Sequence, residues 1–493
     1  MKQFPRIALV VPLCVLFGAP DTLAVSRAIS GFSLGNNLDT HDVVVPSTNG
    51  REPMDPSNDP TQLHPSLRPD TLRLENGQRS GFTNRKVFPS SWWPMRNEGT
   101  AARWNSNVKD YSNWTADRKN LAPTEKYDLL FYPGQSFHFD EFRAYSLEDS
   151  QNPDEERGEG ILRPALTVVG PTTGWEMSNH GTYRPIYPET WWGHCNGWSS
   201  YVTAEKDGAP LRDISVRLEN GKIVECAESD PRGVFFRMAD IEALMSEIYF
   251  HDTATIAGRR CNLARDKIER DAQGRPTDPA CRDLNPGTLH IALTGLLGRG
   301  ASPLSNSNAP PERLPFIMDF TYYDEVWAFP IVGYEIRRAQ YISAAQATRL
   351  VCRGTNQPRR CRRFRWNENA TRFASIEMAV QIVAYEMRPA GLLDAPLSRQ
   401  ATPTLSTYEY VLELDGRGTI LGGEWITSPT SNGPNSKELH PDFIFMSVQS
   451  EATTEFSNDR GGSVDNPYLS STNVKELLRL SRTPAPTSAP TNP

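Results

Sequence analysis

The most reactive side chain that the sequence offers is the thiol of Cys195, which lies in the segment Trp191-Trp-Gly-His-Cys-Asn-Gly-Trp198. A thiol becomes a strong nucleophile when its thiolate is stabilised, and both a helix N-terminus and a nearby imidazolium stabilise it. The aromatic and glycine-rich approach predicts a tight turn, and residues 195–204 are expected to begin a helix whose unpaired N–H groups face the sulfur. The same N–H groups can receive an oxyanion, so the segment predicts acyl-transfer chemistry with Cys195 as nucleophile.

Such a nucleophile needs a general base, which is most often a histidine. In cysteine acyl-transfer sites the helix with the thiol is followed by strands that carry a histidine and then an Asp or Asn. His290 and Asp319 follow Cys195 in this order, and each lies in a strand-like run. We predict that His290 takes and returns the proton and that Asp319 orients its imidazole. His194 ranks second as a base, because a side chain adjacent along the backbone cannot easily point at the thiol.

Six cysteines follow the apolar run near the N-terminus. Four of them form two close pairs, which predict disulfides in an oxidising compartment: Cys261 with Cys281, and Cys352 with Cys361. Cys195 and Cys226 are left over. A bridge between these two would remove the nucleophile, so the alternative interpretation is a non-catalytic, secreted and wall-associated binding protein.

The two ends of the chain differ in composition from its middle. A basic start followed by a short apolar run is typical of a secretory signal peptide, which we place at residues 1–24. Residues 25–85 are poor in aromatic residues and rich in Pro, Asn, Asp, Ser and Thr, which predicts a disordered linker or a removable pro-segment. The catalytic domain is expected at residues 86–450, and a polar, Thr/Ser/Pro-rich tail at residues 451–493.

These features predict a secreted protein that is extracellular or associated with a cell wall. No segment reaches the roughly 20 apolar residues of a membrane span. The net charge of −7 and the pI near 5.8 argue against a nucleic-acid partner, because the charge balance supports no basic face. Sequons at Asn113 and Asn369 would make the protein a glycoprotein in a eukaryotic host.

The middle of the chain mixes helical and strand patterns, which predicts an α+β fold. Residues 240–250 place apolar side chains at helical spacing, whereas residues 288–294 and 316–321 have the pattern of strands. Residues 408–416 and 419–425 flank a short turn with glycine, so they predict a hairpin.

Several motifs along the chain resemble those of one known family: Phe88-Pro-Ser-Ser-Trp-Trp-Pro94, Leu121-Ala-Pro-Thr-Glu-Lys-Tyr-Asp128, Gly193-His-Cys-Asn-Gly-Trp198, Asp283-Leu-Asn-Pro-Gly-Thr-Leu-His290, Val326-Trp-Ala-Phe-Pro330, Gly422-Gly-Glu-Trp425 and His440-Pro-Asp-Phe443. Residues 86–446 thereby resemble the oomycete transglutaminase elicitor family and its bacterial relatives. The resemblance implies a papain/transglutaminase-like core, in which a cysteine at a helix N-terminus packs on antiparallel strands. It also assigns the family's cysteine, histidine and aspartate to Cys195, His290 and Asp319.

The activity that the resemblance implies is a protein-glutamine gamma-glutamyltransferase, which joins glutamine and lysine side chains of protein substrates through a cysteine thioester. Members are described as calcium-independent, and the sequence has neither a calcium loop nor a zinc motif, so no metal and no cofactor are expected. Substrate contacts are expected from Trp192, Asn196, Trp198 and Trp327, whose tryptophans would exclude water. The same catalytic residues would also serve a secreted cysteine peptidase or a glutamine deamidase.

Residues 326–336 resemble the short surface peptide by which plants perceive this family. Trp327, Pro330 and Gly333 fit that pattern, while apolar residues replace three polar ones. A plant surface receptor is therefore a further expected partner. The other interpretation of this segment is a structural strand next to the active site.

Overall fold

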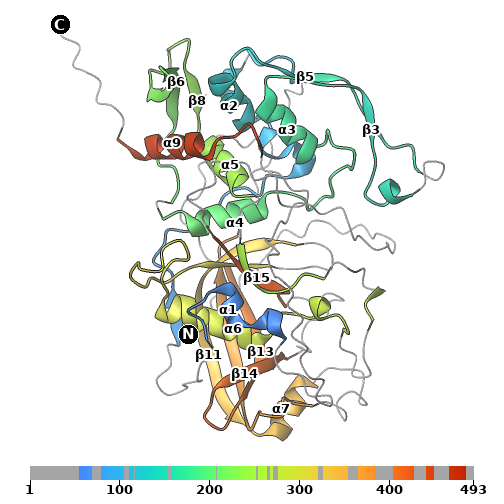
Figure 1. Ribbon diagram of the computed structural model, residues 1–493, viewed down its shortest axis with the longest axis vertical. Helices are drawn as coiled ribbons and strands as arrows, with labels where there is room; N and C mark the ends of the chain where they lie inside the picture. Colours follow the sequence, from blue (N-terminus) through green and yellow to red (C-terminus); the bar gives the residue numbers. More distant parts are fainter. Residues whose placement is uncertain are drawn as a thin grey trace, which may run out of the picture.

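The computed structural model describes residues 55–68, 79–104, 110–115, 117–152, 157–206, 208–250, 254–261, 263, 267–269, 276–319, 326–352, 365–384, 404–426, 440–448 and 466–484. Figure 1 shows two parts along the long axis of the molecule, with a curved sheet in the lower half and a helical part in the upper half. Helix α4 (Cys195–Ala204) lies between them and contacts both the sheet and helix α5 (Met238–Ile248). The expected α+β fold is confirmed.

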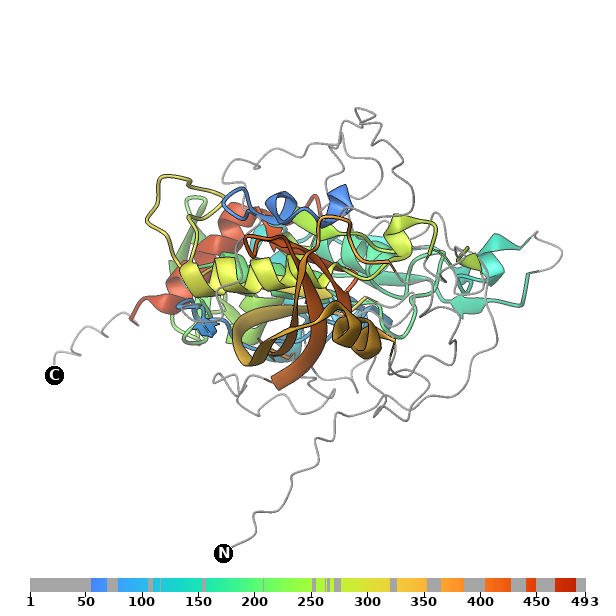
Figure 2. The same cartoon turned by 90° about the horizontal axis from the view of Figure 1, so that it is seen from below.

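The lower part is an antiparallel sheet of eight strands in the spatial order β14-β13-β12-β11-β10-β15-β9, with β1 also paired to β11. The strands are β1 (Ser80–Phe82), β9 (Ala254–Gly258), β10 (Phe316–Asp319), β11 (Ala328–Ile342), β12 (Arg372–Ile382), β13 (Thr404–Leu414), β14 (Ile420–Trp425) and β15 (Phe443–Ser447). The sheet curls strongly in Figure 2. The strand expected at residues 316–321 is β10, and the expected hairpin is the antiparallel pair β13 and β14, so both predictions are confirmed.

The two faces of this sheet belong to different clusters of buried residues, because successive side chains of a strand point to opposite faces. On β10, Phe316 and Met318 pack in the large core that also contains Leu289 of helix α6 (Pro286–Ala292). Ile317 instead packs in a smaller cluster that contains Cys195. Helix α4 therefore covers one face of the sheet and helix α6 the other.

The upper part contains helices, three small sheets and a second core. Its helices are α2 (Pro123–Phe131), α3 (Pro171–Asn179), α5 and α9 (Ser471–Arg482). Its strands are β2 (Phe137–Phe139), β3 (Phe142–Ala144), β4 (Ile161–Arg163), β5 (Leu166–Val168), β6 (Ile214–Glu219), β7 (Lys222–Glu225) and β8 (Val234–Phe236). The helix expected at residues 240–250 is α5, which buries Ile241, Leu244 and Met245 as its apolar spacing predicts.

Short elements complete the fold. Helices α1 (Pro60–Leu63) and α7 (Ala344–Val351) flank the sheet, and the π-helix Leu293–Arg299 continues α6. The 3-10 helices are Pro56–Asn58, Met95–Asn97, Gly99–Ala101, Arg118–Asn120, Asp149–Gln151 and Pro279–Cys281.

The strand expected at residues 288–294 is wrong, since this segment forms helix α6 and the start of the π-helix. The start signal lies just upstream: the side chain of Asn285 accepts a hydrogen bond from the Gly287 N–H, and Pro286 occupies the first turn. Both features are typical of a helix N-terminus. The apolar run is continuous because the helix is buried on all sides, so its periodicity alone did not distinguish it from a buried strand.

The disordered linker expected at residues 25–85 is also wrong for the described residues 55–68 and 79–85. Leu63 and Leu67 are fully buried in the large core, and β1 is hydrogen-bonded to β11. The polar composition of this stretch did not predict its packing. Its two buried leucines are enough to hold it on the fold, because distant residues supply the rest of the core around them. The folded body therefore begins before residue 86, and a removable pro-segment cannot include this stretch without loss of core contacts.

Truncation of Leu63 tests whether this stretch is integral to the fold. We expect Leu63→Ala to lower the free energy of unfolding by about 2–5 kcal/mol, since it deletes a fully buried side chain. Leu211 is 61% exposed, so Leu211→Ala should change the same quantity by less than about 0.5 kcal/mol. Urea unfolding of the full-length proteins measures both values, and equal effects of the two substitutions would contradict the packing of α1.

The tail expected at residues 451–493 needs a similar correction, because residues 471–482 form the amphipathic helix α9. Its buried face contains Val474, Leu477 and Leu478, which pack in the second core against α5. Figure 1 shows α9 lying along the upper part. The apolar residues 474, 477 and 478 have the spacing of one helix face, and this spacing predicts the helix better than the polar composition of the segment does.

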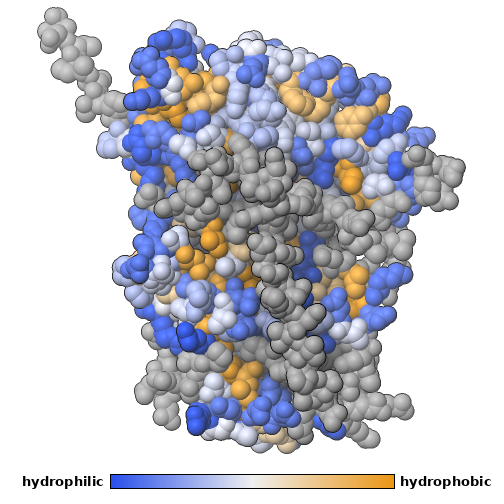
Figure 3. Space-filling model, viewed as in Figure 1, coloured by the Kyte–Doolittle hydropathy of each residue, from blue (hydrophilic) through white to orange (hydrophobic). Residues whose placement is uncertain are grey.

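The surface of the described chain is mainly hydrophilic (Figure 3), as expected when the apolar residues lie in the interior. In the view of Figure 3, hydrophobic residues of the described chain form small groups separated by hydrophilic ones. Among the described residues, no helix is both long and apolar enough to cross a membrane.

Candidate active site

Cys195 is the first residue of α4, as predicted, and His194 precedes it as the N-cap. The thiol is only 4% exposed, and its sulfur lies 3.8 Å from the Val326 carbonyl oxygen, to which it donates. Burial raises the pKa of Cys195, while hydrogen bonds from the backbone N–H groups of Ala328 and Asn196 oppose this rise. The sulfur thus lies among N–H donors at a helix start, which is where a thiolate or an oxyanion is stabilised.

Contacts on both sides of α4 hold this helix start in place. The Ser199 hydroxyl donates to the Ala328 carbonyl on β11, at 2.8 Å. On the other side, the Asn196 side-chain amide donates to the Phe250 carbonyl, also at 2.8 Å. Gly197 permits close packing on α5, because a Cβ at this position would overlap the Ser246 carbonyl oxygen. In this structure the Asn196 side chain makes a contact that positions the helix.

Three tryptophans lie in or against the cluster of the thiol: Trp92, Trp191 and Trp327. Trp92 packs with Cys195 and contacts Trp327 edge to face, with ring centroids 5.2 Å apart. Trp327 is half-buried and therefore accessible in part. Trp327 therefore lies at the thiol cluster, where its expected contact with a substrate stays a prediction.

The other two expected substrate residues lie elsewhere. Trp198 is fully buried in the second core, so it cannot contact a protein substrate in this conformation. Trp192 packs with Met95 and Phe250, and the guanidinium of Arg184 lies 5.0 Å from its ring centroid. Trp192 precedes α4 and Trp198 packs in the second core, so proximity to Cys195 in sequence did not place these side chains at the thiol.

The structure does not bring His290 to Cys195. His290 lies on α6, and its Nδ1 is 2.9 Å from the hydroxyl of Tyr410 on β13. Burial lowers the pKa of His290 to about 4. Since α6 and α4 cover opposite faces of the sheet, the imidazole and the thiol are separated by the sheet itself. The strand expected around His290 is a helix, whereas its position after Cys195 in the chain and the family resemblance were the other grounds for its assignment as general base.

Asp319 lies on the same side of the sheet as the thiol, because it is two residues after Ile317 on β10. Its Oδ1 accepts hydrogen bonds from the N–H groups of Asp442 and Phe443, both at 2.9 Å. Its Oδ2 is buried without a hydrogen-bond partner among the described residues. Burial raises the pKa of Asp319 to about 8, and the negative charge of Asp283 adds to this rise, whereas the two N–H donors and Arg260 oppose it.

The buried carboxyl of Asp319 should make stability depend on pH. In the folded protein Asp319 keeps its proton up to about pH 8, whereas in the unfolded chain it loses the proton near pH 4. The folded state therefore binds more protons between these values, and the free energy of unfolding falls as pH rises through this window. Asp442 has a pKa raised to about 9 by burial and by Asp319, so it acts in the same direction.

We expect Asp319→Asn to weaken this pH dependence, because an amide does not ionise and no longer repels the charge of Asp442. Relative to the wild type, the variant should become progressively more stable from pH 5 to pH 8. Urea unfolding at several pH values measures the difference between the two slopes, which is independent of any constant cost of the substitution. Parallel curves would contradict the raised pKa.

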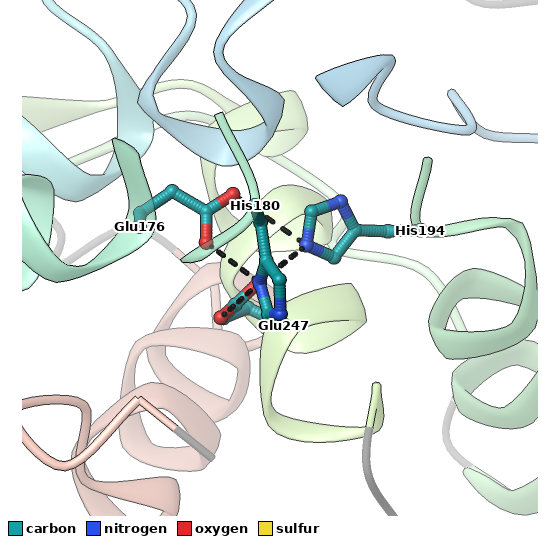
Figure 4. Close-up of side chains that lie close together, drawn as sticks. All are labelled: Glu176, His180, His194 and Glu247. Atoms are coloured by element: carbon teal, nitrogen blue, oxygen red, sulfur yellow. Dashed lines mark hydrogen bonds and ion pairs between the residues drawn. The ribbon is translucent and has the colours of Figure 1, made fainter. Parts of the chain in front are cut away.

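Five of the remaining histidines are also placed, of which His138 is exposed on β2. His440 lies 3.0 Å from Asp283 and stacks on Trp425, and His64 contacts the Ser302 carbonyl. His180 and His194 lie in a buried cluster with Glu176 and Glu247, which Figure 4 shows. Within the described part of the chain, no histidine is hydrogen-bonded to the sulfur of Cys195. His251 lies outside the described residues.

Sequence reasoning missed the cluster of Glu176, His180, His194 and Glu247. The available signal was the spacing of Glu176 and His180, which at four residues apart share one face of α3. The other two members come from separate elements, so no local motif contains the set.

The cysteines settle one of the alternatives. Cys261 and Cys281 form a disulfide, as predicted, and Cys352 is also disulfide-bonded, while its expected partner Cys361 lies outside the described residues. Cys195 and Cys226 are both free. The bridge that would have made the protein non-catalytic is therefore absent between these two residues.

A free cysteine at a helix N-terminus, packed on antiparallel strands, is the arrangement expected of a papain/transglutaminase-like core. The family model of the transglutaminase elicitors matches residues 218–483, and the chain belongs to this family. The matched range begins after α4, so it includes Asp319 but not Cys195.

A solved structure shares the fold. The crystal structure of the GP42 transglutaminase from Phytophthora sojae is similar to this chain with a TM-score of 0.52 and 18% sequence identity, over 87% of this chain and 98% of that chain. A comparison with curated proteins gives no match. The resemblance to the transglutaminase elicitor family is thus confirmed by sequence and by fold.

The segment expected as a surface peptide, residues 326–336, is mostly interior. Within it, β11 runs between β10 and β12, and Val326, Ala328, Ile331 and Tyr334 are buried. The interpretation as a structural strand next to the thiol describes this segment, in which Glu335 is exposed and most other side chains are buried.

Proposed function

We propose that the protein is a protein-glutamine gamma-glutamyltransferase in which Cys195 is the nucleophile. The observation that carries the proposal is the free thiol at the start of α4, beside backbone N–H donors, in a member of the transglutaminase elicitor family. Neither a disulfide nor a salt bridge occupies this sulfur, which leaves it available for covalent chemistry.

In the proposed reaction the sulfur of Cys195 attacks the side-chain carboxamide carbon of a peptidyl glutamine. The carbon–nitrogen bond breaks, ammonia leaves with the proton from the thiol, and a thioester remains. The amine of a lysine then attacks the thioester, which forms the isopeptide bond and returns the proton to the sulfur. The negative oxygen of each tetrahedral intermediate would be stabilised by N–H groups in the first turn of α4.

Access to the thiol requires a change at its contact with Val326. The sulfur is nearly fully buried, and its partner is the carbonyl directly before Trp327. A glutamine side chain would have to displace this contact, and the pair Trp92 and Trp327 would then form the wall beside the thioester. Exclusion of water by this wall would favour attack by an amine over hydrolysis.

The reaction products test the proposal against its alternatives. Full-length protein is incubated with a glutamine-containing peptide, with and without a fluorescent primary amine, and the products are analysed by mass spectrometry. Incorporation of the amine with release of ammonia supports the transferase. Conversion of glutamine to glutamate in the presence of amine would instead indicate a deamidase, and cleavage of the peptide backbone would indicate a peptidase.

The general base can be identified by substitution. Because the sheet separates His290 from the thiol, we expect His290→Gln to reduce amine incorporation by less than about tenfold per folded molecule. Loss of a true general base costs about 10²–10⁴-fold. His251→Gln and His440→Gln complete the series, and circular dichroism gives the folded fraction of each variant. A loss of about 10²-fold or more in folded His290→Gln would restore His290 as the base.

Recognition by a plant receptor stays a separate proposal. The segment from Val326 to Ile336 would have to be released from the sheet before a receptor could read its side chains. Plant responses to the folded protein and to a synthetic peptide of residues 326–336 distinguish the two possibilities: a response to the peptide alone would place recognition after unfolding or proteolysis.

A further inference from the structure

A cluster of two histidines and two glutamates lies directly before the nucleophile helix. Glu176 and His180 come from α3 and its C-cap, Glu247 from the last turn of α5, and His194 is the N-cap of α4. Figure 4 shows the four side chains converging from these three elements. Their side chains are all nearly fully buried, with exposed fractions between 0% and 6%.

The distances within the cluster resemble the edges of a coordination tetrahedron. His194 Nε2 lies 3.2 Å from His180 Nδ1, 3.5 Å from Glu176 Oε1 and 2.8 Å from Glu247 Oε2. His180 Nδ1 lies 3.0 Å from Glu176 Oε2 and 3.4 Å from Glu247 Oε1. Ligands at about 2.0–2.2 Å from a tetrahedral zinc ion are separated by roughly 3.3–3.6 Å. The four ligand atoms lie within 4.8 Å of one another, so small side-chain movements suffice to reach this geometry.

The surroundings of His194 allow the form that a metal requires. Its Nδ1 lies 3.3 Å from the Trp93 carbonyl oxygen and its Nε2 lies 2.8 Å from the Glu247 carboxylate, so each ring nitrogen faces an acceptor. With a metal in place of a proton on Nε2, Nδ1 can keep its proton and donate to the carbonyl, while Nε2 presents a lone pair to the cluster. A metal-bound histidine shows this arrangement, in which the second nitrogen donates to a carbonyl group.

The Glu247 carboxylate provides a second, independent observation. Its Oε2 is buried without a hydrogen-bond partner among the described residues, although it lies 2.8 Å from Nε2 of His194. When Nε2 of His194 carries no proton, this contact sets one lone pair against another. A cation between the two atoms would turn this repulsion into attraction.

The surroundings are those of a closed, structural site. The Thr100 N–H donates to Glu176 Oε1 at 2.8 Å, which orients this carboxylate. The Phe250 ring lies 4.5 Å from both imidazole rings and covers one side of the cluster. Four protein ligands leave no open position for water or substrate, as in structural zinc sites. Two carboxylates, two neutral imidazoles and one divalent cation also sum to zero charge, which burial favours.

We propose that Glu176, His180, His194 and Glu247 bind one divalent cation, with Zn²⁺ the best match to two nitrogen and two oxygen ligands in a tetrahedral arrangement. The cation joins α3 and α5 to the residue directly before Cys195. It thereby fixes the start of α4, and it acts on the thiol only through this position.

The test uses the full-length protein, stripped with EDTA, desalted and then loaded with Zn²⁺. Elemental analysis should give one zinc ion per chain, and zinc should raise the thermal midpoint of the stripped protein. Glu247→Gln and His180→Gln should each weaken zinc binding at least about tenfold, since even outer-shell partners of a metal contribute 10–100-fold. His138→Ala is the matched control, because this exposed histidine also has a carboxylate neighbour, Asp140 at 3.6 Å.

Cobalt substitution keeps the proposal testable if the ligand variants do not fold. Wild-type protein loaded with Co²⁺ should show the strong visible absorption of a tetrahedral ion. Three results would overturn the proposal: stripped wild-type protein that binds no zinc, a cobalt spectrum of the hydrated ion alone, or zinc bound equally by the wild type and by folded ligand variants. Any of these three results would mean that shared protons, and not a metal ion, join the histidines and glutamates of the cluster.

Discussion

Cys195→Ala should abolish amine incorporation, with a loss of at least about 10⁴-fold, because the nucleophile is required to form the thioester. The protein carries its own control, since Cys226 is the other free cysteine among the described residues and is half-buried directly after β7. Cys226→Ala should retain amine incorporation close to that of the wild type. A fluorescence assay with casein as glutamine donor measures both variants.

The fold should survive the loss of the thiol. Cys195→Ser nearly preserves the side-chain volume and should have a thermal midpoint close to that of the wild type, while it also lacks the thioester chemistry. Amine incorporation that persists in folded Cys195→Ala or Cys195→Ser would refute the proposed nucleophile. Loss in Cys226→Ala but not in Cys195→Ala would move the reaction to the other cysteine.

Lys126→Met should lower the free energy of unfolding by about 3–5 kcal/mol, because it leaves the Asp240 carboxylate buried without its cation. Lys126 and Asp240 form a 2.5 Å ion pair in which both side chains are fully buried. The Asp240 carboxylate also accepts from the Trp104 indole and from the Arg237 N–H, which ties helices α2 and α5 to the adjoining segments.

The matched control is the ion pair of Lys119 and Glu228, whose side chains are 57% and 54% exposed. An exposed pair of this kind contributes within about 1 kcal/mol, so Lys119→Met should have little effect on urea unfolding. Similar decreases in the free energy of unfolding for Lys126→Met and Lys119→Met would show that the buried Asp240 carboxylate does not depend on the charge of Lys126. The comparison is independent of the proposed catalysis, since none of these four residues takes part in the proposed reaction.

Several features could be predicted from the sequence because their signals are local. The glycine-rich turn before Cys195 predicted a helix start, and the apolar spacing of residues 240–250 predicted α5. The turn between β13 and β14 predicted their hairpin, and the short separation of Cys261 and Cys281 predicted their disulfide. In each case the deciding contacts lie within about 20 residues along the chain, where spacing restricts the geometry directly.

Other features could not be predicted from the sequence, because they depend on which face of the sheet each segment packs against. His290 and Asp319 both follow Cys195 in the expected order, yet α6 carries His290 to one face while the alternation of β10 places Asp319 on the other. Leu63 and Val474 lie in segments of polar composition, but distant apolar residues complete their burial. Sequence order and composition do not contain this information.

The cluster before α4 is the clearest case of tertiary determination. Glu176 and Glu247 are 71 residues apart in sequence, and His194 lies between them in a turn that contains no metal motif. Their approach depends on the packing of α3 and α5 around the start of α4, and therefore on side-chain contacts among elements that are separate in the chain. The sequence alone determined that the thiol of Cys195 begins a helix. The tertiary structure decided which groups surround this thiol, because the burial and the direction of a side chain depend on how distant elements pack together.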